Sequence, residues 1–233
     1  MRNYYIFRSG RIKRKDNTIF FETQEGERIP LPINDIDSIY LFGEIDLNTK
    51  LLNFLSQNNI MVHFFNYYGF YTGTFYPKEF LNSGEVIVRQ VEHYLDRNKR
   101  LLLAKEFVRG AIYGSIQNLK RYKHKLGDEI EKLTQLYEAS AVQDSVEQLM
   151  GIEGNAKDLY YSTFEKIIEQ DIDFKRRVKN PPDNMMNALI SFVNSIIYSE
   201  ILKEIYKTQL NPTISYLHEP GFRRFSLSLD VSG

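Results

Sequence analysis

The sequence has no cysteine and no tryptophan. The absence of cysteine excludes disulfide bonds, cysteine nucleophiles and zinc sites built from thiolates. It also suits a reducing compartment, and because no secretory signal follows Met1, we expect a cytoplasmic protein. We find no apolar run that we expect to cross a bilayer, so the sequence predicts no association with a membrane.

The net charge is zero, because 30 Lys and Arg residues balance 30 Asp and Glu residues. A neutral chain is not typical of a general nucleic-acid-binding protein. The charges are nevertheless uneven: residues 89–125 hold 10 Lys/Arg against 3 Asp/Glu, and residues 128–169 hold 10 Asp/Glu against 3 Lys/Arg. This asymmetry fits one basic and one acidic face, or two solvated helical surfaces.

The first 76 residues predict a small β-rich domain. Short apolar and aromatic runs alternate with turn signals at residues 9–10, 16–17 and 25–26. Residues 28–32 predict an edge strand, because proline cannot donate to a ladder. A short helix is expected over residues 48–58. His63 lies in an apolar run of buried-strand length, where we expect a hydrogen-bonded core residue.

Beyond a predicted linker at residues 77–84, the apolar spacing becomes helical. Helices are expected over residues 85–125, 128–137, 145–164 and 185–206, with Gly127 ending the first. Residues 225–229 alternate polar and apolar side chains, as in a short strand. Asp230, which follows, could then be a surface acid or a site residue. The fold class is therefore α+β multidomain, with a β-rich N-terminal domain (1–76) followed by an all-α C-terminal domain (85–233). The helix over residues 185–206 is strongly apolar, and its buried face is predicted to hold Met186, Leu189, Ile190, Val193, Ile197, Ile201 and Ile205.

Three ionisable residues in the last third of the chain are candidates for chemistry. Glu153 lies between Gly151 and Gly154, whose small side chains allow a substrate to approach; alternatively, it is an acid stabilised near a helix N-terminus. His218 precedes a turn and lies on a loop, where functional side chains concentrate. Asp230 follows 12 residues later. Carboxylates with one imidazole suit Mg²⁺ or Mn²⁺ better than a structural zinc.

Basic residues flank these candidates in the sequence. They could clamp phosphates, or they could be solvated surface residues. The candidates for DNA binding are Arg176, Arg177, Arg223 and Arg224.

Taken in order, these segments resemble the CRISPR-associated integrases of spacer acquisition, the Cas1 family. The resemblance runs the whole length of the chain. It rests on residues 66–73, on Gly151-Ile152-Glu153-Gly154 followed by Tyr160-Tyr161, on Arg177 with Pro181-Pro182-Asp183, on Leu217-His218, and on Ser226-Leu227-Ser228-Leu229-Asp230.

The resemblance implies a metal-dependent DNA endonuclease or integrase that inserts new spacer DNA into a CRISPR array. A 3′-hydroxyl of the incoming fragment would attack a phosphate at the edge of a repeat. Glu153, His218 and Asp230 would be the catalytic metal ligands for Mg²⁺ or Mn²⁺. The expected partners are spacer-precursor and repeat DNA, a second copy of the chain joined through the N-terminal domain, and a small ferredoxin-like subunit.

The sequence departs from the family at two places. Family members carry a further acidic metal ligand three residues after the position of Asp230, where this sequence has Gly233, and they favour Gly-Phe at the position of Ser215-Tyr216. The sequence therefore resembles a C-terminally shortened member. Two alternatives follow: a catalytically impaired DNA-binding or assembly fragment, and a plain metal-dependent nuclease on branched DNA.

Overall fold

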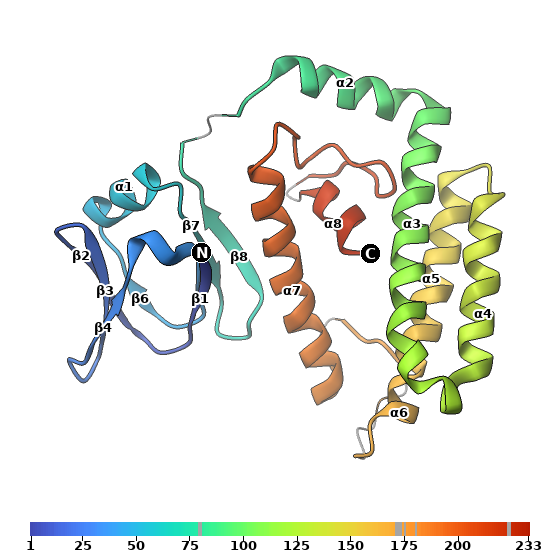
Figure 1. Cartoon of the computed structure of the whole chain (residues 1–233), viewed down its shortest axis with the longest axis horizontal. Coiled ribbons are helices and arrows are strands. Elements are labelled where there is room, and N and C mark those ends of the chain that lie inside the picture. The colour runs from blue at the N-terminus through green and yellow to red at the C-terminus, as the bar shows by residue number, and fades with distance from the viewer. Residues whose placement is uncertain (79–80, 171–173, 175, 180, 223–224) are drawn as a thin grey trace. The chain divides into compact units, whose positions relative to one another are not determined.

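The structure is a computed structural model that describes residues 1–78, 81–170, 174, 176–179, 181–222 and 225–233. The chain divides into two compact units, Met1–Asn82 and Ser83–Gly233. The division falls inside the segment 77–84 that the sequence predicts as a linker. As the sequence predicts, the first unit is rich in strands and the second is helical (Figure 1).

The first unit holds two four-stranded sheets. One sheet has the order β1-β5-β7-β8, with β7 and β8 antiparallel and the other neighbours parallel. The second has the order β4-β3-β2-β6, so β4 lies at an edge, as its proline predicts. The strands are β1 (Arg2–Ile6), β2 (Gly10–Lys15), β3 (Thr18–Thr23), β4 (Arg28–Leu31), β5 (Ile36–Leu41), β6 (Ile45–Asp46), β7 (Met61–Phe65) and β8 (Tyr71–Phe75).

Helix α1 (Thr49–Gln57) and inward-facing strand residues form the core of this unit. The Asn48 side chain begins α1 by accepting a hydrogen bond from the Leu51 backbone N–H at 2.9 Å. Gly10 permits close strand approach, because a Cβ there would lie 2.4 Å from the Glu22 carbonyl oxygen. His63 is buried and its Nδ1 lies 2.8 Å from Thr74 Oγ1, which confirms the core role predicted for it.

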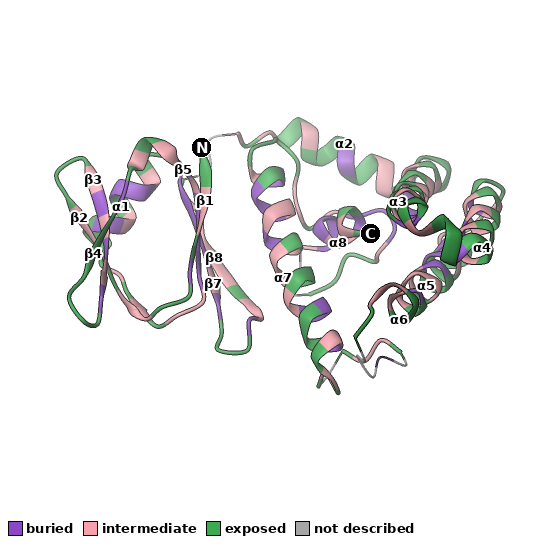
Figure 2. Ribbon diagram, turned by 60° about the horizontal axis from the view of Figure 1, so that its bottom comes forward, coloured by how far each residue is buried: buried purple, intermediate pink, exposed green. Residues whose placement is uncertain are grey.

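In the second unit, three helices pack side by side around one apolar core (Figure 1). They are α3 (Arg97–Leu119), α4 (Lys123–Ala141) and α5 (Val146–Ser162). Before them comes α2 (Gly84–Leu95), and after them come α6 (Phe164–Ile167), α7 (Met185–Tyr206) and α8 (Ser226–Ser232). The buried residues of α3 recur every three or four positions from Ala104 to Leu119, so they share one face of the helix; Figure 2 marks buried residues in purple.

The single helix predicted over residues 85–125 is wrong, since the structure divides it into α2, α3 and the start of α4. Asp96 makes the first break: its backbone is extended, and its side chain accepts hydrogen bonds from the Asn98 and Lys99 backbone N–H groups. A 3₁₀ turn at Lys120–Tyr122 makes the second. Gly127 does not end a helix, because it lies inside α4 beside the non-helical Leu126.

Further predictions for this unit are wrong. Residues 226–232 form a helix rather than a strand, and Asp230 is 1% exposed, which excludes the alternative of a surface acid. Helix α7 has its predicted bounds, but Leu189, Val193 and Ile197 are exposed instead of buried.

Helix α7 is also long and apolar enough to cross a membrane by length and composition, whereas the sequence analysis predicted no apolar run of that length. That test alone is weak evidence, because soluble core helices also meet it.

Candidate active site

Helix α5 places Glu153 on its buried face. Leu149, Glu153 and Ala156 are all buried and share that face by helical spacing. Glu153 is 7% exposed, and its Oε1 accepts a hydrogen bond from Lys157 Nζ at 2.8 Å. The sequence places Glu153 near a helix start; the structure places it in the middle of the helix, so the helix dipole does not account for its burial.

Asp230 of α8 holds the loop that carries His218. Its Oδ2 accepts hydrogen bonds from the backbone N–H groups of Tyr216 and Leu217, at 2.6 and 3.0 Å. Its Oδ1 accepts from the His218 backbone N–H at 2.8 Å and lies 2.9 Å from His218 Nδ1. A carboxylate has about four lone-pair sites, so these four donors occupy all of them.

The pair of His218 and Asp230 leaves one imidazole nitrogen available. A carboxylate cannot donate, so Nδ1 carries a proton, and in the neutral ring Nε2 presents its lone pair. No group among the described residues hydrogen-bonds Nε2, and the His218 side chain is 22% exposed. A histidine oriented by a carboxylate through its other nitrogen is the usual arrangement of a metal-binding imidazole.

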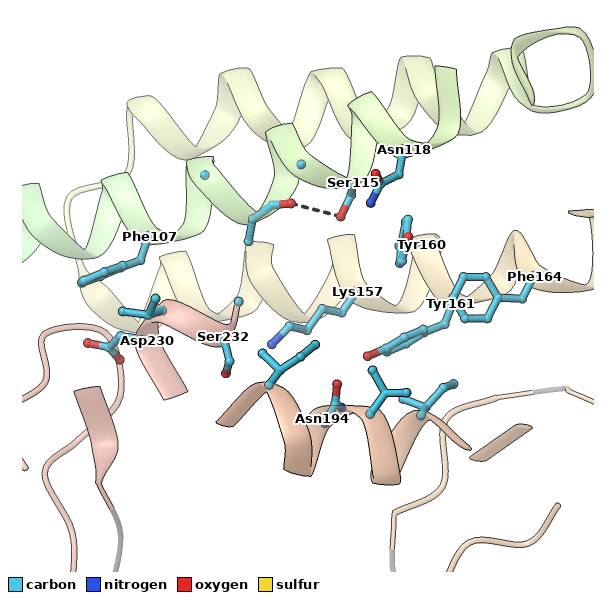
Figure 3. A pocket seen from close by; sticks show the side chains of 18 of the residues that line it. Phe107, Ser115, Asn118, Lys157, Tyr160, Tyr161, Phe164, Asn194, Asp230 and Ser232 are labelled. Atoms are coloured by element: carbon cyan, nitrogen blue, oxygen red, sulfur yellow. Dashed lines mark hydrogen bonds between the residues drawn. The ribbon is translucent and has the colours of Figure 1, made fainter. Parts of the chain in front are cut away.

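One member of each pair lines the same cavity, whereas Glu153 and His218 themselves are not among its lining residues. Lys157 and Asp230 both line a cavity of about 660 Å³ between α3, α5, α7 and α8. Figure 3 shows Lys157, Asn194, Asp230 and Ser232 around it. Glu153 is held to Lys157, and His218 is held to Asp230. Leu217, next to His218, packs in the same core cluster as Leu149 and Ala156.

The donor set fits a divalent cation with few protein ligands. Glu153 keeps one carboxylate oxygen that accepts no hydrogen bond from the described residues, and His218 keeps Nε2. Mg²⁺ keeps several waters and uses few protein ligands, so two donors are compatible with it. Within the described ranges, no three Asp, Glu or His side chains form a ready ion site, and Asp230 has no lone pair left to give.

The four arginines predicted to bind DNA differ in their surroundings. Arg177 is committed to structure: its guanidinium donates to the Val178 and Asn187 carbonyl oxygens, to Asn187 Oδ1 and to Ser191 Oγ. Burial lowers its pKa. These bonds attach the segment before α7 to the first turns of that helix. Arg176 is exposed, whereas Arg223 and Arg224 lie outside the described residues.

A second network, which the sequence gave no reason to expect, holds the other side of the His218 loop. Arg100 of α3 donates to the Tyr216 carbonyl oxygen at 2.9 Å and to Glu219 Oε1 at 2.6 Å. Tyr94 of α2 donates to Glu219 Oε2 at 2.7 Å and stacks under the Arg100 guanidinium at 4.4 Å. These partners are separated by more than 100 residues, so no local spacing signals them.

This network predicts a pH-dependent contribution of Glu219 to stability. Hydrogen bonds from Arg100 and then Tyr94 lower the pKa of Glu219 below its usual 4.5. A carboxylate whose pKa is depressed by folding stabilises the fold above its unfolded pKa, and this stabilisation is lost as pH falls through the folded pKa. The Tm of wild type should therefore exceed that of Glu219→Gln at pH 7, and the gap should close at pH values below 4.5. Thermal melts across pH measure the gap, and Glu138→Gln, at an exposed site without an ion pair, is the control.

The fold and the site together describe a two-part protein in which a β-rich unit is followed by a helical unit. The helical unit carries a buried glutamate, Glu153, and a histidine, His218, that is oriented by a carboxylate. These side chains are of the types that bind divalent metal ions. The family model for CRISPR associated protein Cas1 matches residues 4–232. The chain belongs to the Cas1 family.

Close relatives cover the chain from end to end. A protein of Thermodesulfovibrio yellowstonii named CRISPR-associated endonuclease Cas1 3 is 52% identical over 233 residues, which are 100% of this chain and 71% of the relative. The Fusobacterium nucleatum CRISPR-associated endonuclease Cas1 is 49% identical over 99% of this chain and 69% of its own. The chain thus spans about 70% of the length of these relatives.

Solved structures confirm the fold. A Cas1 protein from Thermotoga maritima is 44% identical and superimposes with a TM-score of 0.89 over 99% of this chain and 73% of that one. A casposase bound to its integration product is 21% identical, with a TM-score of 0.81 over 100% of this chain and 68% of that one. At that identity the likeness establishes the fold alone.

Proposed function

We propose that this chain is a metal-dependent DNA strand-transfer enzyme that inserts spacer DNA into a CRISPR array. The observation that carries the proposal is that Lys157, which holds the buried Glu153, and Asp230, which orients His218, line one cavity. The chain is also about half identical to named CRISPR-associated endonucleases. Mg²⁺ or Mn²⁺, when bound by Glu153 and His218, would supply Lewis-acid stabilisation of the phosphate and the leaving oxygen.

Each residue has a distinct task in this proposal. Glu153 offers a carboxylate oxygen, and its ion pair with Lys157 offsets the cost of burying that charge. His218 offers Nε2, while Asp230 fixes the tautomer and orientation of the ring. We therefore assign Asp230 as a positioning residue instead of the direct ligand that the sequence suggests. The attacking group is a DNA 3′-hydroxyl, and the bond that breaks joins the target phosphorus to its own 3′-oxygen.

The proposed partners follow from the same reading. Arg176, Arg223 and Arg224 are proposed to contact phosphates of the spacer precursor and the repeat, whereas Arg177 is already engaged by the protein. A homodimer through the N-terminal unit and a small ferredoxin-like subunit complete the proposed assembly. A Cas6-RT-Cas1–Cas2 complex that shares the fold at 18% identity and a TM-score of 0.78 is consistent with a partner subunit.

One assay separates the proposal from its alternatives. A labelled DNA fragment and a supercoiled plasmid bearing a repeat are incubated with the chain and Mn²⁺, and a parallel reaction contains a labelled branched DNA. Covalent transfer of the label into the plasmid supports strand transfer, since hydrolysis cannot produce it. Cleavage of branched DNA without transfer would make the chain a plain nuclease, which the name of the relatives also allows. Neither product, with no Mn²⁺ binding, would favour a DNA-binding or assembly fragment.

A further inference from the structure

The turn that joins α3 to α4 presents a group of basic side chains. Within residues 120–125, every residue except Tyr122 is basic and exposed. Figure 1 shows the turn at the end of the α3–α4 pair. We define the basic turn as the exposed residues Lys120, Arg121, Lys123, His124 and Lys125.

The basic turn is held in a fixed conformation by the core beneath it. Lys120–Tyr122 form a 3₁₀ turn, and Leu126 departs from helical geometry. Leu119 and Leu126 are 2% and 0% exposed, and Tyr122 packs against the same apolar cluster. Leu119, Tyr122 and Leu126 contact the core three and four residues apart, and the basic residues between them are exposed.

The cations of the basic turn have no acidic partner among the described residues. Lys120 Nζ donates to a neutral acceptor, Gln117 Oε1, at 3.1 Å. No Asp or Glu occurs between Glu106 and Asp128. The nearby Glu129 is already paired with Lys166.

Two basic residues of strand β2, in contrast, form ion pairs with acidic residues. Arg11 pairs with Asp46 at 3.2 Å, and Lys13 pairs with Glu22 at 2.6 Å. The charges of β2 are thus partly neutralised inside the protein. Those of the basic turn are like charges on neighbouring residues, so they repel one another. A fold that keeps this repulsion on a rigid turn points to an anionic ligand.

The surroundings of the basic turn favour a phosphate backbone over an acidic protein. Protein interfaces depend on buried aromatic or aliphatic anchors. Between Tyr113 and Val142, a fully described stretch, no large apolar side chain is exposed. A duplex carries one negative charge per ~1.7 Å of axis, and lysines and arginines bind it without shape complementarity. We infer that the basic turn binds the backbone of the DNA substrate; this rests on the proposed function.

The test is DNA binding by a charge-neutralised variant. Lys120→Gln, Arg121→Gln, Lys123→Gln and Lys125→Gln are combined in one protein. A matched control changes four exposed lysines that form no ion pair with any described residue: Lys15, Lys50, Lys99 and Lys132, each to Gln. Affinity for a fluorescent duplex is measured by anisotropy over a salt series in EDTA, so that no reaction occurs.

The basic-turn variant should bind at least about 10-fold more weakly, and its salt slope should fall by roughly 3 to 4, since each lost phosphate contact removes about 0.9. Its Tm should be unchanged or higher, because repulsion is relieved. The control should keep most of the wild-type slope. An unchanged slope in the basic-turn variant, or an equal loss in both variants, would overturn the inference. A wild-type protein that binds no DNA would instead defeat the proposed function itself.

Discussion

DNA joining by the His218→Ala variant should fall at least about 100-fold below wild type, measured as covalent transfer of a labelled fragment into the repeat plasmid. His218 Nε2 is the only nitrogen donor of the proposed ion site, and even indirect ligand partners cost 10–100-fold when removed. Asp230 keeps its three backbone hydrogen bonds in this variant, so the loop should stay folded.

The matched control is His93→Ala. His93 Nδ1 lies 2.8 Å from the Arg89 carbonyl oxygen on α2, and its ring takes no part in the proposed site. This variant should join DNA at the wild-type rate. Joining by His218→Ala at a rate close to that of His93→Ala would remove His218 from the reaction.

Asp230→Asn should destabilise the helical unit by about 3 kcal/mol. The asparagine oxygen can accept from two of the four donors, and its Nδ2 would bring two more donors toward the remaining N–H groups. Each buried donor left without a partner costs about 1–3 kcal/mol. The Tm should fall by about 10 °C in a unit of this size.

Asp158→Asn is the control, because Asp158 is exposed on α5 and has no ion pair among the described residues. Thermal melts of the two variants measure the difference. If the Asp230→Asn variant melts within a degree or two of Asp158→Asn, the hydrogen bonds at Asp230 do not hold the His218 loop.

Local patterns were sufficient to predict much of the fold. The period-2 and 3.6-residue spacings predicted strands, then helices, and α7 begins and ends where its apolar run does. The Glu153–Lys157 pair has helical spacing and could also have been predicted. The division of α2 from α3 was missed because Asp96 is a cap, which apolar periodicity does not register.

Helix α8 shows why spacing fails for a short buried segment. Its alternation of serine and leucine resembles a strand with one exposed face, but Ser226, Leu227 and Ser228 are all buried. The Ser226 hydroxyl donates to the Thr213 carbonyl oxygen at 2.9 Å, so tertiary contact removes the cost of burying it. Asp230 is buried as well, and its hydrogen bonds to residues 216–218 are tertiary contacts that spacing does not reveal.

The groups around the site are joined by contacts between distant parts of the chain. Arg100 and Glu219 are 119 residues apart, and Gln90 and Asn211 are 121 apart. The sequence indicated His218 through its loop position, but not that Arg100 and Asp230 hold that loop from two helices. Arg177 was predicted to bind phosphate because its charge was visible and its four acceptors were not.

The most direct test of the account is a manganese titration by calorimetry of wild type, Glu153→Gln and His218→Ala. We predict one Mn²⁺ site in wild type, and affinity reduced at least about 10-fold in each variant, since each removes one of two protein donors. Wild-type protein without a Mn²⁺ site, or variants that bind the ion as tightly as wild type, would contradict the claim that Glu153 and His218 share one cation.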